Sequence, residues 1–374
     1  MNIVEKLDLA IKSKEIGTID GFYVVPYKDG VLHKPTYMTN EEWTAFFSAM
    51  PETARKEYGE GGGDELSEKN GRPPKMASYG SSSRMIYMLS RQKDIFHYEK
   101  KLPTTVGGKA NLDGFYEEDN HYIFVEAKCH EPYTTKKVSV SKCYENLYKY
   151  INEHKPSNIY IDMEASKCGK YLNVEYFVDG KKIERFDIKQ MICHLLGIAT
   201  GMLKGTLKRL PTDFIYLLYD PTELDLPPQT KDEIDNIYHR TCYESDMIDF
   251  SKLFRTLLEF LRDTKYKGVM SDCEINNLVN TFTYTLAPQE LYTILISHIA
   301  HNKKDETFYI TKDNEDGTRE VVYRLKCTQE QAYTVFDYVI RAQQKERRLS
   351  NFSIRWRVIR LFDSLTDVQL CQES

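Results

Sequence analysis

The chain has 374 residues, of which 41% are hydrophobic and 29% are charged, a composition typical of globular proteins. Its net charge of -5 argues against a uniformly basic, histone-like binder, although a local basic cleft is compatible with it. The eight cysteines form no CxxC pair, which argues against a zinc site and a disulfide scaffold. No apolar run is long enough to span a membrane. We therefore expect a cytoplasmic protein that does not enter a membrane.

Residues 1–75 predict an N-terminal extension followed by a linker. Residues 1–15 alternate charged and apolar positions, as in an amphipathic helix, and Thr39 or Asn40 can cap a second helix that begins with two glutamates. Residues 59–75 are rich in glycine, proline and charge, which is typical of a loop.

Residues 76–230 predict an α/β core. The elements expected in chain order are a helix from the serines at 81–83, a strand at 95–103, two strands within 110–128, a helix at 139–151, a hairpin at 171–186, a helix at 188–203 capped by Asp187, and a buried strand at 213–219. Strand, helix and strand in this order favour a crossover connection within one sheet. We expect a mixed central sheet flanked by helices.

Residues 231–374 predict a mainly helical C-terminal region. Segments 250–263 and 288–302 are amphipathic at helical spacing, and one hairpin is expected around 314–318. His298 and His301 lie three residues apart in the second segment, but no further ligand accompanies them, so packing or surface roles explain them better than zinc.

The strand that ends at Lys128 contains the candidate catalytic residues of the sequence. Side chains alternate faces along a strand, so Glu126 and Lys128 share one face. A turn at 117–120 would fold the preceding strand back and bring Asp113 toward Glu126. Two such carboxylates suit Mg²⁺ or Mn²⁺, and the backbone carbonyl of Ala127 could add a third ligand.

These residues and a bound metal ion can together provide what phosphodiester hydrolysis requires. Lys128 would stand beside a metal-bound water and stabilise the developing hydroxide and the negative charge on the phosphate. The spacing alone is weak evidence, because an ExK or DxK pattern recurs elsewhere, for example at Glu153 and Asp187. The alternative is an edge strand on which Glu126 and Lys128 form a solvated ion pair.

The segment "LDGFYEEDNHYIFVEAK" resembles the D-x(n)-ExK signature of the PD-(D/E)xK nuclease superfamily, the restriction-endonuclease-like fold. The resemblance covers roughly residues 76–220 and includes the order helix, strands, ExK, helix and strand. It implies that Asp113 and Glu126 hold divalent metal and that Lys128 assists the attacking water. The proline that often precedes the family's aspartate is Leu112 here.

Many members of the superfamily have a further upstream glutamate. The helix at 82–92 has no acidic residue, so Glu99 on the following strand is the candidate and Glu65 its rival. Gln190 loosely matches a glutamine that some members carry on the helix after the catalytic strands, and His194 lies one turn further along; an ordinary polar helix face would explain both. Arg84 could contact a phosphate at its helix start, although the serines before it are equally explained as a helix cap.

Two stretches are locally basic, in contrast to the negative net charge of the whole chain. Residues 181–210 hold seven Lys and Arg against two acids, and residues 341–360 hold seven against one. Arg355 and Arg357 flank Trp356 in the second stretch, an arrangement that suits a nucleic-acid backbone. A solvated helix face would explain the same pattern.

The sequence predicts a Mg²⁺- or Mn²⁺-dependent endodeoxyribonuclease, best explained as a restriction-type enzyme. Repair and mobile-element nucleases use the same core. The alternatives are a DNA-binding module that has lost catalysis and a structural or interaction protein with no nucleic-acid role. Cutting both strands of a duplex would favour a homodimer, but nothing in the sequence marks a dimer surface.

Overall fold

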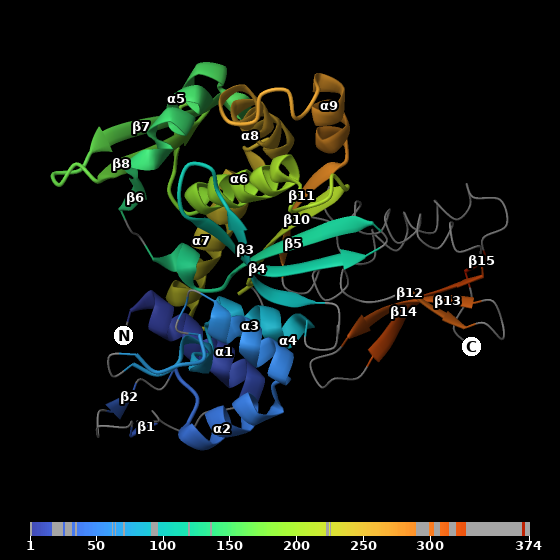
Figure 1. The fold of residues 1–374 in the computed structure, drawn as a ribbon. Coiled ribbons are helices and arrows are strands. Elements are labelled where there is room, and N and C mark those ends of the chain that lie inside the picture. The colour runs from blue at the N-terminus through green and yellow to red at the C-terminus, as the bar shows by residue number, and fades with distance from the viewer. Residues whose placement is uncertain are drawn as a thin grey trace. The chain divides into compact units, whose positions relative to one another are not determined.

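The computed structural model divides the chain into two compact units, Met1–Thr285 and Leu286–Ser374 (Figure 1). The structure describes residues 2–16, 25–26, 32–33, 36–61, 63, 65–69, 72–90, 96–118, 120–134, 137–221, 224, 226–288, 299–302, 307–313, 319–326 and 369–370. The division falls well after residue 230, so the helices that follow this position pack with the core rather than in a separate region.

A mixed five-stranded sheet forms the centre of the first unit, in the order β11-β10-β5-β4-β3. Its strands are β3 (His97–Pro103), β4 (Lys109–Glu118), β5 (His121–Lys128), β10 (Thr212–Leu218) and β11 (Phe282–Pro288). β3, β4 and β5 pair antiparallel, whereas β10 pairs parallel with β5. The predicted strands and the crossover between β5 and β10 are confirmed.

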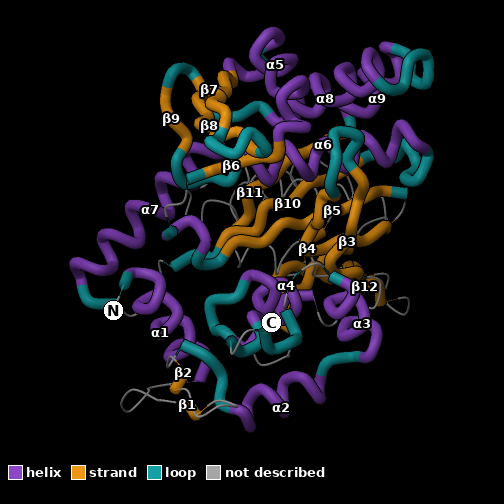
Figure 2. Tube along the Cα trace, turned by 60° about the vertical axis from the view of Figure 1, so that its left-hand side comes forward, coloured by secondary structure: helices purple, strands orange, loops and turns teal. Residues whose placement is uncertain are grey.

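Helices cover both faces of this sheet, as Figures 1 and 2 show. α6 (Ile188–Lys204) packs on β3 and β4, and α8 (Phe250–Thr264) packs on α6. α3 (Glu52–Glu60) and α4 (Ser82–Ser90) lie on the opposite face. α6 approaches closely at Gly197, where a Cβ atom would lie 2.6 Å from the Ala110 Cβ. The fold is α/β, with a mixed sheet between helices.

The remaining elements of the first unit surround this core. They are α1 (Ile3–Ile16), β1 (Val25–Pro26), β2 (Leu32–His33), α2 (Asn40–Ala49), β6 (Val138–Ser141), α5 (Glu145–His154), β7 (Ile159–Ala165), β8 (Tyr171–Val178), β9 (Lys181–Ile183), α7 (Pro228–Asp246) and α9 (Asp272–Asn280). Thr39 caps α2 through a capping box, and Asp187 caps α6 by accepting from Gln190 N. Both predicted caps are confirmed.

The segment predicted as a helix at 139–151 is a helix only in its second half. Residues 138–141 form β6 because their backbone pairs with β8, for example Val138 with Val174. β7 was not predicted from the sequence. It pairs with β8 along its whole length and completes a second small sheet with β6 and β9. The hairpin at Asp179-Gly180 is confirmed, since both residues have positive φ.

The described part of the second unit is a four-stranded sheet rather than a set of helices. Its strands are β12 (Ile299–Asn302), β13 (Thr307–Asp313), β14 (Arg319–Lys326) and β15 (Gln369–Leu370). β13 and β14 form the predicted hairpin. Residues 299–302 were expected to be helical, but their backbone pairs with β13. In the described ranges, no helix has both the length and the apolar content to cross a membrane.

Candidate active site

The candidate site lies where the regular alternation of β3 and β4 breaks. Tyr98 stacks on Tyr58 of α3, whereas Leu102, four residues further on, lies under Gly197 of α6 on the other face of the sheet. An even spacing would place both side chains on one face, so β3 changes sides between them. The change coincides with Glu99, which has φ +54°, a conformation that a non-glycine residue rarely adopts.

β4 changes sides at the position opposite Glu99. Gly114 faces Phe96 and Ile86 of the α4 side, but Ala110 faces α6. The ladder between β4 and β5 ends at the pair Gly114–Val125. One residue before this end, Asp113 Oδ2 accepts the Ala127 N–H at 2.8 Å. At the end of the ladder, the Asp113 carboxylate is therefore the acceptor for a backbone N–H group of β5.

Glu126 and Lys128 lie on the α6 side of β5, as the alternation of the sequence predicts. Glu126 is fully buried, and its Oε1 accepts a hydrogen bond from Lys128 Nζ. Glu126 Oε2 lies 2.9 Å from Nε2 of His194, a buried residue of α6. Each carboxylate oxygen thus lies within ion-pair distance of a nitrogen atom.

Neighbouring charges move the pKa values of these groups in different directions. Burial and the charge of Glu126 raise the pKa of Asp113 well above its usual range. Burial alone would also raise the pKa of Glu126, but Lys128 and His194 outweigh it and lower this pKa to about 2. Burial opposes the charge on Lys128 as well, and Glu126 and Glu131 outweigh it and raise the pKa of Lys128.

Glu99 and its rival Glu65 lie in one acidic cluster beside Asp113. Glu99 is buried and accepts a hydrogen bond from Asn111 Nδ2. Burial raises the pKa of Glu99, the Asn111 hydrogen bond opposes this, and the charge of Glu65 adds to the rise. Glu65 is itself buried and pairs with Lys75 at 3.2 Å. The structure therefore brings both candidates for the upstream acid together rather than choosing between them.

The structure describes two of the four residues predicted to contact DNA, Arg84 and Gln190. Arg84 is buried, with its guanidinium over the rings of Tyr79 and Phe46. Gln190 lies in the first turn of α6 and is partly exposed. Arg355 and Arg357 lie outside the described residues.

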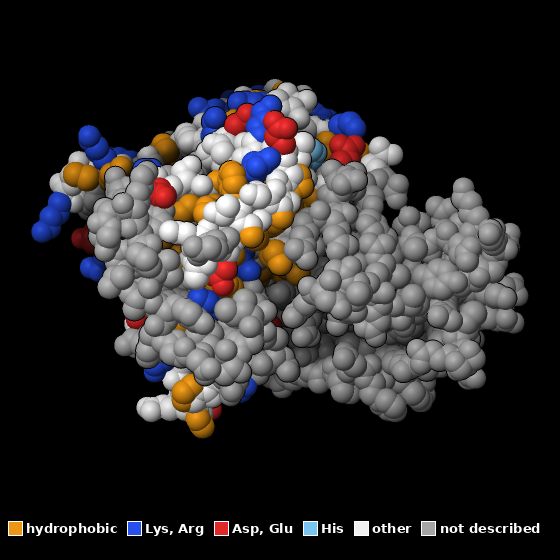
Figure 3. All heavy atoms as spheres, turned by 90° about the horizontal axis from the view of Figure 1, so that it is seen from below, with side chains coloured by type: hydrophobic (Ala, Val, Ile, Leu, Met, Phe, Trp, Pro, Cys, Tyr) orange, Lys and Arg blue, Asp and Glu red, His pale blue; other side chains and the backbone are white. Residues whose placement is uncertain are grey.

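The basic stretch at 181–210 does not form one patch. Its charges lie before or at the start of α6 and at or after its end, and several pair with acids, including Lys182 with Glu175 and Lys208 with Glu117. On the face drawn in Figure 3, Lys and Arg side chains are interspersed with acidic ones. The second basic stretch lies outside the described residues.

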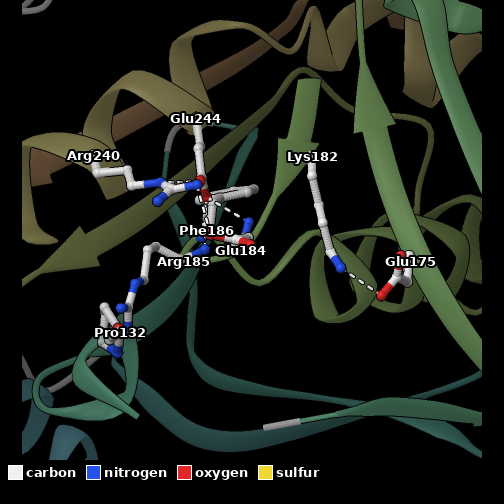
Figure 4. A network of polar contacts seen from close by, with 8 residues as sticks. All are labelled: Pro132, Glu175, Lys182, Glu184, Arg185, Phe186, Arg240 and Glu244. Carbon is white, nitrogen blue, oxygen red and sulfur yellow. Dashed lines mark hydrogen bonds and ion pairs between the residues drawn. The ribbon is translucent and has the colours of Figure 1, made fainter. Parts of the chain in front are cut away.

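A buried glutamate fixes the loop that leads into α6. Glu244 Oε2 of α7 accepts the backbone N–H groups of residues 184, 185 and 186 at 2.7–3.1 Å, and Arg240 binds Oε1 (Figure 4). Arg185 then donates from Nη1 to the Pro132 carbonyl, close after β5. This network joins the start of α6 to the chain that follows Lys128.

His194 is the site residue whose role sequence reasoning missed. The sequence placed it one turn beyond Gln190 and explained it as part of a polar face. A stronger signal was present, because His194 is the only basic residue between Lys189 and Lys204 in an otherwise apolar helix. A lone ionisable group in such a helix is expected to find a buried partner.

The donors at this site suit a divalent cation in kind, since Asp113 and Glu126 offer hard carboxylate oxygens and their like charges oppose each other. Across the described ranges, however, no three His, Cys, Asp or Glu side chains already converge as metal ligands. Comparison with known proteins adds no relative: no family model, no curated protein and no solved structure matches the chain.

Proposed function

We propose that this protein hydrolyses DNA phosphodiester bonds with the help of Mg²⁺ or Mn²⁺. The observation that carries the proposal is the meeting of Asp113 with Glu126 and Lys128 at the end of two paired strands of a mixed sheet. This is the arrangement that the resemblance to the PD-(D/E)xK superfamily implies. A restriction-type role is the specific form that we favour.

In this function Asp113 and Glu126 would hold the cation, with the Ala127 carbonyl as a further oxygen ligand. The cation would supply a water activated at neutral pH and charge neutralisation at the phosphate. Lys128 carries a permanent positive charge within this buried group, which suits it to stabilise the negative charge that builds on the phosphate. Glu99 and Glu65 would add negative charge that favours cation binding.

The test is cleavage of plasmid and branched DNA with Mg²⁺ or Mn²⁺ by the wild type and by Asp113→Asn and Lys128→Ala. We expect both substitutions to reduce the cleavage rate at least about 100-fold, the scale of losing one group that stabilises a transition-state charge. Lys182→Ala is the matched control, because Lys182 also pairs with a glutamate but lies exposed on β9. Equal cleavage by the wild type and Asp113→Asn would contradict the proposal.

One observation favours a second candidate, a DNA-binding module without catalysis. Glu126 is fully buried, and its two oxygens already lie against Lys128 and His194. This candidate predicts that the wild type binds DNA but does not cut it with either metal. In that case Asp113→Asn would leave DNA affinity unchanged.

A further inference from the structure

His194 presents its ring to Glu126 in a fixed orientation. It is buried on α6, and its ring stacks on Phe214 of β10 with centroids 6.1 Å apart and planes 27° apart. α6 is fixed by the close packing at Gly197 and by the Asp187 cap. The ring nitrogen that faces Glu126 is therefore positioned by the fold and not by the carboxylate alone.

The two nitrogens of His194 have different environments. Nε2 lies 2.9 Å from Glu126 Oε2, an ion-pair distance, whereas Nδ1 points away from this carboxylate; both nitrogens are buried, and neither makes a hydrogen bond of good geometry within the described part of the chain. A proton on Nε2 lies beside the negative charge of the carboxylate, whereas a proton on Nδ1 lies on the far side of the ring from it. The contact thus selects the state of the ring in which Nε2 is the donor.

A carboxylate has about four lone-pair sites, two on each oxygen. Lys128 occupies one site on Oε1 and His194 occupies one on Oε2, so each oxygen retains a site for another cation. The two nitrogens also fix the rotation of the carboxylate plane. Groups that hold a metal-binding side chain in this way strengthen metal binding, although they do not touch the metal.

We propose that His194 is a positioning residue that orients Glu126 for a divalent cation held with Asp113. This inference rests on the proposed function and assigns His194 no contact with the metal or the DNA. Lys128 holds the opposite oxygen of the same carboxylate, so His194 completes a two-point support for Glu126.

The first experiment measures the Mn²⁺ dissociation constant of the full chain directly, from the electron paramagnetic resonance signal of free Mn²⁺, without DNA. His194→Gln keeps a donor of similar reach, whereas His194→Phe keeps the flat ring and loses the donor. We expect His194→Phe to weaken Mn²⁺ binding about 10- to 100-fold and His194→Gln to remain within about threefold of the wild type. Wild-type affinity in His194→Phe, or equal weakening in both variants, would overturn the inference.

The second experiment tests the contact without metal, by urea unfolding in EDTA. We expect His194→Phe to increase the unfolding equilibrium constant about tenfold when Glu126 is present and much less in a Glu126→Gln background. Equal effects in both backgrounds would overturn the role of His194 even if the wild type binds Mn²⁺ and cuts DNA. Coupling in EDTA together with no Mn²⁺ binding by the wild type would instead overturn the proposed function, and the metal-orienting role with it.

Discussion

Asp113 and Glu126 are neighbouring carboxyl groups whose environments act on their charges in opposite ways. Glu126 is kept ionised by two nitrogen partners, which lower its pKa to about 2 although burial opposes this. Asp113 has one backbone donor, and burial together with the Glu126 charge raises its pKa. Without a cation, the negative charge on Asp113 is therefore unfavourable in the folded state, which is what a cation site requires.

This difference predicts that Asp113→Asn stabilises the metal-free protein at neutral and alkaline pH. The folded carboxyl keeps its proton above the ordinary aspartate pKa of about 3.9, so the stability of the wild type falls as pH rises through its folded pKa. Asparagine lacks this loss and can still accept the Ala127 N–H. We expect a gain of at least about 1 kcal/mol in unfolding free energy at pH 8.

The measurement is urea unfolding in EDTA between pH 4 and pH 8. The gain should vanish toward pH 4, and Mn²⁺ should reverse the order of the two proteins, because only the wild type gains a bound cation. A variant less stable than the wild type at pH 8 would contradict the raised pKa. The same result strengthens the cleavage test, since activity lost in a stabilised variant is not lost through unfolding.

At the scale of elements, the site depends on how α6 and the strand ends are held. Glu244 gathers three backbone N–H groups and Arg240 at the loop before α6 (Figure 4). Glu244 is buried, so a substitution leaves these donors without their acceptor in a place with little access to water. Through Glu244, α7 thus holds this loop in place. The loop in turn fixes the register of α6, which presents His194.

We predict that Glu244→Ala lowers the free energy of unfolding by about 3 kcal/mol or more, the scale of removing one partner of a buried, hydrogen-bonded charge. Glu175→Ala is the matched control, because Glu175, like Glu244, pairs with a basic side chain (Lys182) but lies exposed on β8. Its effect should stay below about 1 kcal/mol. Chemical denaturation compares the two variants, and equal effects would show that the buried network contributes no more than a surface pair.

The elements themselves divide into those that the sequence predicts and those that it does not. Alternation and capping predicted β5 and the start of α6, because each depends on residues next to one another in the chain. The change of sides at Glu99 was not predicted, since a positive φ is rare in a glutamate and no local residue pattern marks it. The contact between His194 and Glu126 was missed for a related reason, because it joins residues 68 positions apart.

At the scale of the whole molecule, the first unit contains every described residue of the candidate site. The basic charge of residues 181–210 is dispersed and partly paired, which weakens it as a DNA contact. Residues 341–360 carry seven Lys and Arg against one acid and belong to the second unit. Under the proposed function, residues 341–360 are therefore the stronger candidate for the DNA contact.

We predict that residues 1–288, which keep all of β11, fold cooperatively and bind Mn²⁺ like the full chain. Their DNA affinity should depend less steeply on salt, because each phosphate neutralised by Lys or Arg adds about 0.9 to the slope of log K against log salt. If residues 341–360 bind the DNA backbone, the slope for the full chain should be steeper than the slope for the truncated chain by about 3 or more. Fluorescence anisotropy with one duplex across a salt series measures it. Equal slopes would place the DNA contact in the first unit, and failure of residues 1–288 to fold would show that the second unit is needed for stability.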